Sequence, residues 1–269
     1  MVRLYDQHTH SIHSNEKEAV SSVEEMCLGA LEQGFAGLAI TDHCDMYRDL
    51  LNAEERMRKS VTDICTARET FGDKVFLSMG IELGSGHLNP EESQRFLSMG
   101  EFDIVLGSLH AAQGVSTRYS QIAKDAPDKP EMFRDYLDRQ IRMAQWGGYD
   151  VLSHLTFPCR YFATGGEHLD IRNYEDQLRE LFTLMAQSGL GLEVNTSGLY
   201  NPSHGVTMPE LWELKLFRAC GGEIVTVGSD SHSRGRVGCG IVQGMELLKE
   251  AGFRYLSVFR QRKPEMVAL

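Results

Sequence analysis

The sequence predicts an α/β fold, most simply a closed or nearly closed barrel of seven parallel strands. The chain of 269 residues repeats one unit, in which a short apolar run rich in β-branched residues precedes a longer amphipathic stretch. This alternation is typical of parallel strands connected by helices. The short runs are apolar throughout, as expected for strands buried on both faces. An open doubly wound sheet is the alternative, but no GxGxxG motif follows the first run, which argues against a dinucleotide site.

Seven runs are predicted as strands and six stretches as helices. The strands are expected at residues 2–8, 35–43, 74–82, 102–110, 149–155, 190–195 and 222–232. The helices are expected at residues 22–33, 53–70, 130–145, 174–188, 209–219 and 241–251. The first helix has clear end signals, because Glu25 follows Ser22 by three residues and Gly34 stands just after the last helical position.

Composition and charge exclude several classes of protein. The 27 Lys and Arg residues against 38 Asp and Glu residues give a net charge of −11, so nucleic acid is not an expected partner. There is no apolar run of about 18 residues, so no membrane-spanning helix is expected. The polar start MVRLYDQHTH does not suit a signal peptide, and the widely spaced cysteines are expected to be reduced, which together favour the cytoplasm. Without a linker or a repeat, residues 1–269 are interpreted as a single domain.

Metal-binding residue types close the predicted strands. Six of the ten histidines stand at the carboxyl end of a strand, and in a parallel barrel these ends meet at the face that carries the active site. The candidate metal ligands are His8, His10, His43, Glu82, His110, His154, Asp230 and His232.

The spacing of these residues indicates metal chemistry. The imidazoles of His8 and His10 are two residues apart, so on a strand they point to the same side, and Asp230 and His232 repeat this spacing. Asp42 faces away and is expected to support a neighbouring imidazole. Eight ligands exceed the needs of one tetrahedral ion, so two or three zinc, manganese or iron ions are expected. Paired metals bridged by a carboxylate are typical of phosphoryl transfer.

The other histidines carry weaker signals. His204, in the loop after the sixth strand, is expected to be either a catalytic proton donor or substrate contact, or a solvated loop residue. His13, three residues after His10, is either a further ligand or, as we expect, a solvated residue. His87 and His168 lie in polar loops and are expected to be exposed. No GxSxG motif surrounds Ser229, so a serine nucleophile is not expected.

In order along the chain, these residues resemble the PHP superfamily of metal-dependent phosphoesterases, and most of all its histidinol-phosphate phosphatase branch. The motifs are DQHTHS (6–11), TDH (41–43), GIELG around Glu82, SLH (108–110), SHL (153–155), NTSGL (195–199) and GSDSH (228–232). The resemblance implies a distorted seven-stranded (β/α)7 barrel with a trinuclear metal centre. It also implies that a metal-bound hydroxide hydrolyses a phosphomonoester, with Asp230 and His232 as catalytic residues.

The resemblance implies further site residues. It makes Glu16 an additional metal ligand and Arg160 a contact to the substrate phosphate, a role that suits the planar guanidinium. Related phosphatases often carry a second arginine in or after the NTxG segment, where this chain has Ser197 and Tyr200. Arg234 and Arg236 are candidates to compensate for it.

The expected reaction is hydrolysis of L-histidinol phosphate to L-histidinol and phosphate, a step of histidine biosynthesis. The alternative is a related phosphatase or phosphodiesterase that acts on a phosphotyrosine protein, a nucleotide or a sugar phosphate. Segments 83–101 and 111–131 are long enough to form lids over a small substrate, which favours the small molecule. The sequence does not indicate an oligomeric state.

Overall fold

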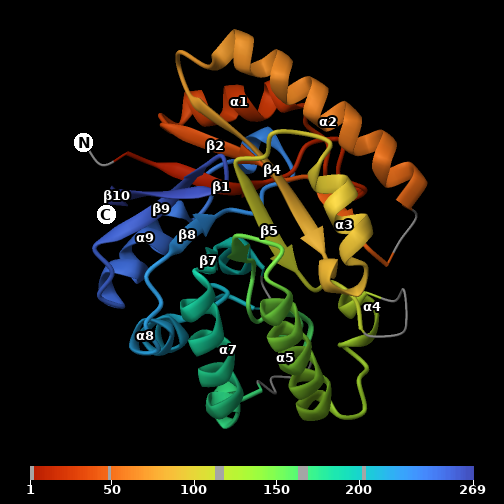
Figure 1. The fold of residues 1–269 in the computed structure, drawn as a ribbon. Coiled ribbons are helices and arrows are strands. Elements are labelled where there is room, and N and C mark those ends of the chain that lie inside the picture. The colour runs from red at the N-terminus through yellow and green to blue at the C-terminus, as the bar shows by residue number, and fades with distance from the viewer. Residues whose placement is uncertain (1–2, 48–49, 113–117, 163–168, 202–203) are drawn as a thin grey trace.

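Parallel strands form a nearly closed barrel in the computed structural model, which describes residues 3–47, 50–112, 118–162, 169–201 and 204–269 (Figure 1). Neighbouring strands follow the order β1-β2-β4-β5-β6-β7-β8, and short β3 extends alongside β4. The strands are β1 (Tyr5–Thr9), β2 (Gly37–Ile40), β3 (His43–Asp45), β4 (Phe76–Gly84), β5 (Ile104–Ser108), β6 (Val151–Leu152), β7 (Gly191–Asn195) and β8 (Val225–Gly228). The predicted fold class is therefore confirmed.

The barrel closes between β1 and β8 through few backbone hydrogen bonds. The amide of Asp230 donates to the carbonyl oxygen of His8 at 2.8 Å, and the amide of His10 donates to Ser231 at 2.7 Å. An isolated bridge between Thr9 and Ser231 stands where a full ladder would be. This seam between the first and last strands of the barrel runs into the residues that form the candidate site.

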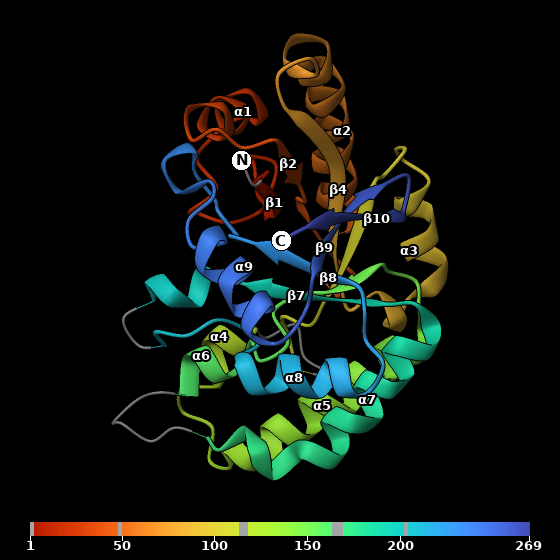
Figure 2. The same ribbon diagram turned by 90° about the vertical axis from the view of Figure 1, so that its left-hand side faces the viewer.

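Helices cover the outside of the barrel (Figures 1 and 2). Each of the six predicted helical stretches contains a helix. The Ser22 side chain caps the first one by accepting from the amide of Glu25, as its sequence predicts. The helices are α1 (Val23–Glu32), α2 (Leu50–Phe71), α3 (Pro90–Leu97), α4 (Tyr119–Ile122), α5 (Lys129–Trp146), α6 (Cys159–Phe162), α7 (Glu175–Ser188), α8 (Leu211–Ala219) and α9 (Ile241–Glu250). None in the described part of the chain has the length and apolar character needed to cross a bilayer.

The C-terminal hairpin seals the end of the barrel that lies opposite the candidate site. Strands β9 (Tyr255–Arg260) and β10 (Lys263–Ala268) pair antiparallel. Phe259 packs with Ile104 and Val151. The amide of Gln261 donates to Asp103, just before β5. A bulky side chain thus fills the amino end of the barrel.

Candidate metal centre

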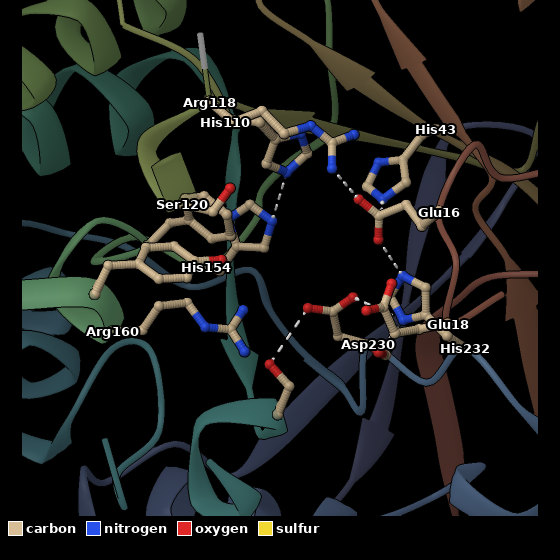
Figure 3. Close-up of a pocket in the computed structure, with 13 residues that line it drawn as sticks. Glu16, Glu18, His43, His110, Arg118, Ser120, His154, Arg160, Asp230 and His232 are labelled. Atoms are coloured by element: carbon tan, nitrogen blue, oxygen red, sulfur yellow. Dashed lines mark hydrogen bonds and ion pairs between the residues drawn. The ribbon is translucent and has the colours of Figure 1, made fainter. Parts of the chain in front are cut away.

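All the predicted strand-end ligands meet at the carboxyl end of the barrel. His8, His10 and Glu82 are fully buried. The other five line a cleft of about 370 Å³ (Figure 3). Non-glycine residues with positive φ occur here, at His154 (24°) and Asp230 (55°), and such strain commonly marks functional sites. We call this space the metal cleft; its lining is Glu16, Glu18, His43, His110, Arg118, Ser120, His154, Phe157, Arg160, Tyr161, Ser197, Asp230 and His232.

A first ligand group forms across the seam between β1 and β8. The Nε2 atoms of His8 and His10 lie 3.0 Å apart, which confirms that the two imidazoles point to the same side. The Oδ1 atom of Asp230 lies 3.2 Å from Nε2 of His10 and 3.7 Å from Nε2 of His8. Glu82 completes the group, with Oε2 3.4 Å from His8 and 3.5 Å from His10. Such separations suit donors to one ion with metal–nitrogen bonds of about 2.0–2.1 Å.

A second ligand group uses the same Glu82 carboxylate. Its Oε1 atom lies 2.8 Å from Nε2 of His154 and 3.1 Å from Nε2 of His110. Its Oε2 atom lies 2.7 Å from Nδ1 of His43. Glu82 therefore stands between the imidazoles of β1 and those that follow β5 and β6, in the position of a bridging carboxylate.

A third ligand group contains Glu16. Its Oε2 atom lies 2.7 Å from Nε2 of His232 and 3.5 Å from Nε2 of His43. The ring of His10 stacks against both His43 and His232, with ring centroids 4.3 Å apart in each case. Glu16, which the family resemblance implies as a ligand, thus reaches the centre from the loop after β1.

The electrostatics fit divalent cations. Burial, followed by repulsion from His43 and His232, lowers the pKa of His10 to about 3, so its lone pair is free to bind a metal. Burial raises the pKa of Glu82, but attraction to the surrounding histidines outweighs burial and holds it well below the usual value. Each ring nitrogen of buried His43 faces a carboxylate, with Nδ1 2.7 Å from Glu82 and Nε2 3.5 Å from Glu16. Buried carboxylates facing imidazole nitrogens of this kind are the donor set of zinc, manganese and iron sites.

Carboxylates behind the candidate ligands contact their imidazoles. Glu193 on β7 contacts Nδ1 of His8 at 2.7 Å, and Asp45 on β3 contacts Nδ1 of His110 at 3.1 Å. The sequence analysis missed both, although a glutamate in the middle of the apolar run 190–195 was a signal for Glu193. Asp42 acts less directly than expected, because it accepts from the hydroxyl of Ser14, which in turn contacts Nδ1 of His10.

The remaining predicted residues fall into different places. Arg160 lines the metal cleft, with its guanidinium 5.6 Å from the ring centroid of Phe157. His204 is not among the residues that line the cleft. His13 is half-buried and contacts Asp63 at 2.7 Å, so it is not simply solvated. His87 is half-buried too, and His168 lies outside the described residues.

Only one of the two segments expected to form lids contributes residues to the metal cleft. Arg118 and Ser120, from segment 111–131, line the metal cleft, and the sequence analysis did not single out either residue. Residues 113–117 lie outside the described residues. Segment 83–101 forms η1 (Gly86–Leu88) and α3, and none of its residues lines the cleft. Asn89 caps α3 and Pro90 is its first residue, which together are a helix signal. The interpretation of residues 83–101 as a lid did not use this signal.

Comparison with known families gives the class of the protein. Residues 6–197 match the PHP domain family. This chain belongs to the PHP domain family, as the motif resemblance implies.

Named relatives and a solved structure extend this result. The histidinol-phosphatase of Lactococcus lactis subsp. lactis is 25% identical over 263 residues, which cover 97% of this chain and 96% of that protein. A Thermotoga maritima protein named "Probable histidinol-phosphatase" is 32% identical over 157 residues, which cover 58% of this chain and 60% of that protein, less than two thirds of its length. The crystal structure of the Lactococcus lactis histidinol phosphate phosphatase, complexed with zinc, L-histidinol and phosphate, superposes with a TM-score of 0.82 at 24% identity. This superposition covers 98% of this chain and all of that one, and shows the shared fold.

Proposed function

We propose that this chain is a metal-dependent phosphomonoesterase that hydrolyses L-histidinol phosphate to L-histidinol and phosphate. One observation carries the proposal. The buried Glu82 carboxylate stands between two groups of imidazoles, beneath a cleft that also presents the Arg160 guanidinium. Arrangements of this kind serve phosphoryl transfer. The relatives named histidinol-phosphatase support the choice of substrate.

We propose that two or three divalent ions, zinc, manganese or iron, occupy the three ligand groups. When bound, such ions activate water and neutralise the charge of the phosphoryl group. The assigned ligands are His8, His10, Glu16, His43, Glu82, His110, His154, Asp230 and His232.

The side chains around the ligand groups would bind and orient the ester. Arg160 approaches the cleft from α6 and would bind two phosphate oxygens through its planar guanidinium. Asp230 and His232 belong to the proposed catalytic set, and Asp230 also accepts weakly from the hydroxyl of Ser197 at 3.3 Å. The catalytic role of His204 stays a prediction, since it does not line the metal cleft.

The proposal extends to the setting of the reaction. We propose that residues 1–269 work as a single domain in the cytoplasm, with a small phosphate ester as partner. Neither nucleic acid nor a membrane is expected to take part, because the net charge of −11 disfavours contacts to a phosphate backbone.

Ser197 favours a second candidate within the same chemistry. It lines the metal cleft at a position where related phosphatases often place an arginine. An enzyme without that arginine could act on a different phosphate ester, such as a sugar phosphate, a nucleotide or a phosphotyrosine peptide.

A substrate panel tests both candidates. We would measure phosphate release from L-histidinol phosphate, sugar phosphates, nucleotides and a phosphotyrosine peptide, on protein loaded with zinc or manganese. A kcat/KM of roughly 10⁴–10⁶ M⁻¹s⁻¹ for L-histidinol phosphate alone is expected. Preference for another ester would overturn the substrate, and no release from any ester would overturn the phosphatase proposal.

A further inference from the structure

Two arginines from different segments of the chain line the metal cleft. Arg160 comes from α6, and Arg118 comes from the segment before α4 (Figure 3). In the view of Figure 3 their guanidinium groups both point toward the space enclosed by His154, Asp230 and Glu16. An anion in this space would meet positive charge from both groups.

Arg118 keeps donors available for such an anion. Its Nη1 atom donates to Oε1 of Glu16 at 2.6 Å, and its Nη2 atom lies 3.8 Å from Oδ2 of Asp45, beyond hydrogen-bond distance. Its Nε atom is buried without a hydrogen-bond partner among the described residues. A guanidinium carries five N–H donors, so the short contact with Glu16 uses a minority of them.

The charge balance around Arg118 depends on the metal. Glu16 directs its other oxygen to His232 and lies close to His43. A cation bound by the third ligand group would be partly neutralised by the Glu16 carboxylate. That carboxylate would then neutralise less of the positive charge on Arg118. The guanidinium would then face the cleft with a net positive charge, where a phosphate dianion would be its natural partner.

The other arginines near the site are placed less well. Arg234 pairs with Glu32 on the surface of the protein. Arg236 lies 6.0 Å from the ring centroid of Tyr200 and lines an adjoining hollow, which shares Arg160 and Asp230 with the metal cleft, but it does not line the metal cleft itself. Arg118 is therefore the better placed second cation.

We propose that Arg118 and Arg160 hold the substrate phosphate between them, with Arg118 as a direct phosphate contact. This inference rests on the proposed phosphatase function and adds a residue to its substrate site. The hydrogen bond from Arg118 to Glu16 would also connect the proposed phosphate contact directly to the third ligand group. The competing explanation is that Arg118 only positions Glu16.

Direct titration of inorganic phosphate separates the two explanations. Wild type, Arg118→Ala and Arg118→Lys would be loaded with manganese or zinc, counted for bound metal by elemental analysis, and titrated calorimetrically with phosphate. Arg179→Ala is the matched control, because it removes a half-exposed arginine of α7 that pairs with Glu175 and does not line the cleft. The titration needs no ester, so a failed histidinol phosphate assay leaves its result standing.

At equal metal content, Arg118→Ala should bind phosphate about 10- to 100-fold more weakly, the usual loss for a charged hydrogen bond. Arg118→Lys should bind phosphate with intermediate affinity, because lysine keeps the positive charge but lacks the paired N–H donors of the planar guanidinium. If Arg118→Ala binds less metal than the wild type, the phosphate affinity of fully metal-loaded Arg118→Lys distinguishes the two explanations. Wild-type phosphate affinity in the fully loaded variants, or no phosphate binding by the wild type, would overturn the proposal.

Discussion

Oε1 of Glu193 lies 2.7 Å from Nδ1 of His8, although the two residues are 185 positions apart in the chain. A carboxylate at this distance holds the proton on Nδ1, which leaves the lone pair of Nε2 for a metal. The other oxygen of Glu193 accepts from the amide of His154 at 2.8 Å and from the side chain of Asn195 at 3.2 Å. One buried carboxylate thus contacts a candidate ligand on β1 and another that follows β6.

Replacing Glu193 with Gln should weaken metal binding. All three partners of the carboxylate donate hydrogen bonds, so the amide of Gln would turn N–H groups toward one of them. The expected loss is about 10- to 100-fold in metal affinity, measured by competition with a chelator. Glu223→Gln, at an exposed position, should behave as wild type. Unchanged affinity in Glu193→Gln would show that Glu193 does not tune the site.

Glu82→Gln tests the shared carboxylate. Because Glu82 belongs to the first and second ligand groups, its loss should lower the bound metal by more than one ion per chain. Turnover of a phosphate ester should fall roughly a thousandfold or more. Elemental analysis and steady-state kinetics measure the two effects, and a variant with full metal content would contradict the bridging role.

Arg160→Ala should affect the substrate and spare the metal. Arg160 lines the cleft, where its guanidinium lies near the rings of Phe157 and Tyr161, and it is not one of the assigned metal ligands. The KM for a phosphate ester should rise, or kcat/KM fall, by about 10- to 100-fold with bound metal unchanged. Full activity in this variant would remove Arg160 from the phosphate site.

Metal binding should release protons. Burial lowers the pKa of His110, but the carboxylates of Glu82 and Asp45 outweigh burial and raise it to about 9 in the metal-free protein. At pH 7 this imidazole is therefore protonated and must lose its proton to bind a metal. Apparent metal affinity should rise with pH up to about 9. Calorimetry in buffers with different ionisation enthalpies should detect at least one proton released per chain, and none would contradict this pKa.

A buried glutamate away from the site should make stability depend on pH. Burial raises the pKa of Glu213, on α8, to about 8 from the ordinary 4.5. The folded state thus keeps a proton that the unfolded state loses above pH 4.5, so this contribution is complete at low pH and is lost as pH rises toward 8.

Glu213→Gln should remove that dependence, because an amide resembles the protonated acid. At pH 8 the variant should gain on the order of a few kcal/mol and unfold roughly 5 °C higher or more, with little change at pH 5. Thermal unfolding at the two pH values measures this, with Glu223→Gln as control. An equal shift at both pH values would show that charge is not the cause.

That the strand-end candidate ligands would meet could be predicted because their signals are local. His8 and His10 share a strand, so their spacing alone indicates a common direction. Glu82 and His110 each close an apolar run, and the parallel fold brings the ends of all such runs together. Little tertiary information was needed for this part of the site.

The rest depends on contacts between distant segments. Arg118 meets Glu16 across 102 positions of sequence, and nothing beside either residue indicates the other. Glu193 and Asp45 reach the imidazoles of His8 and His110 only because the sheet brings distant segments together. The C-terminal hairpin was not predicted either. Strand β10 is exposed along almost its whole length and offers no apolar run, and nothing near Phe259 on β9 indicates that its side chain enters the barrel.

The seam between β1 and β8 gives the metal centre a role in assembly. The first ligand group joins His8 and His10 near the start of the chain to Asp230 near its end, where the backbone supplies few hydrogen bonds of its own. During synthesis the group is incomplete until the last strand of the barrel has been made. A metal ion bound there would act as a late cross-link, and each tenfold rise in free metal above the dissociation constant would add about 1.4 kcal/mol to the stability of the fold. The metal supply of the cell would then govern how long the folded chain persists as well as how fast it works.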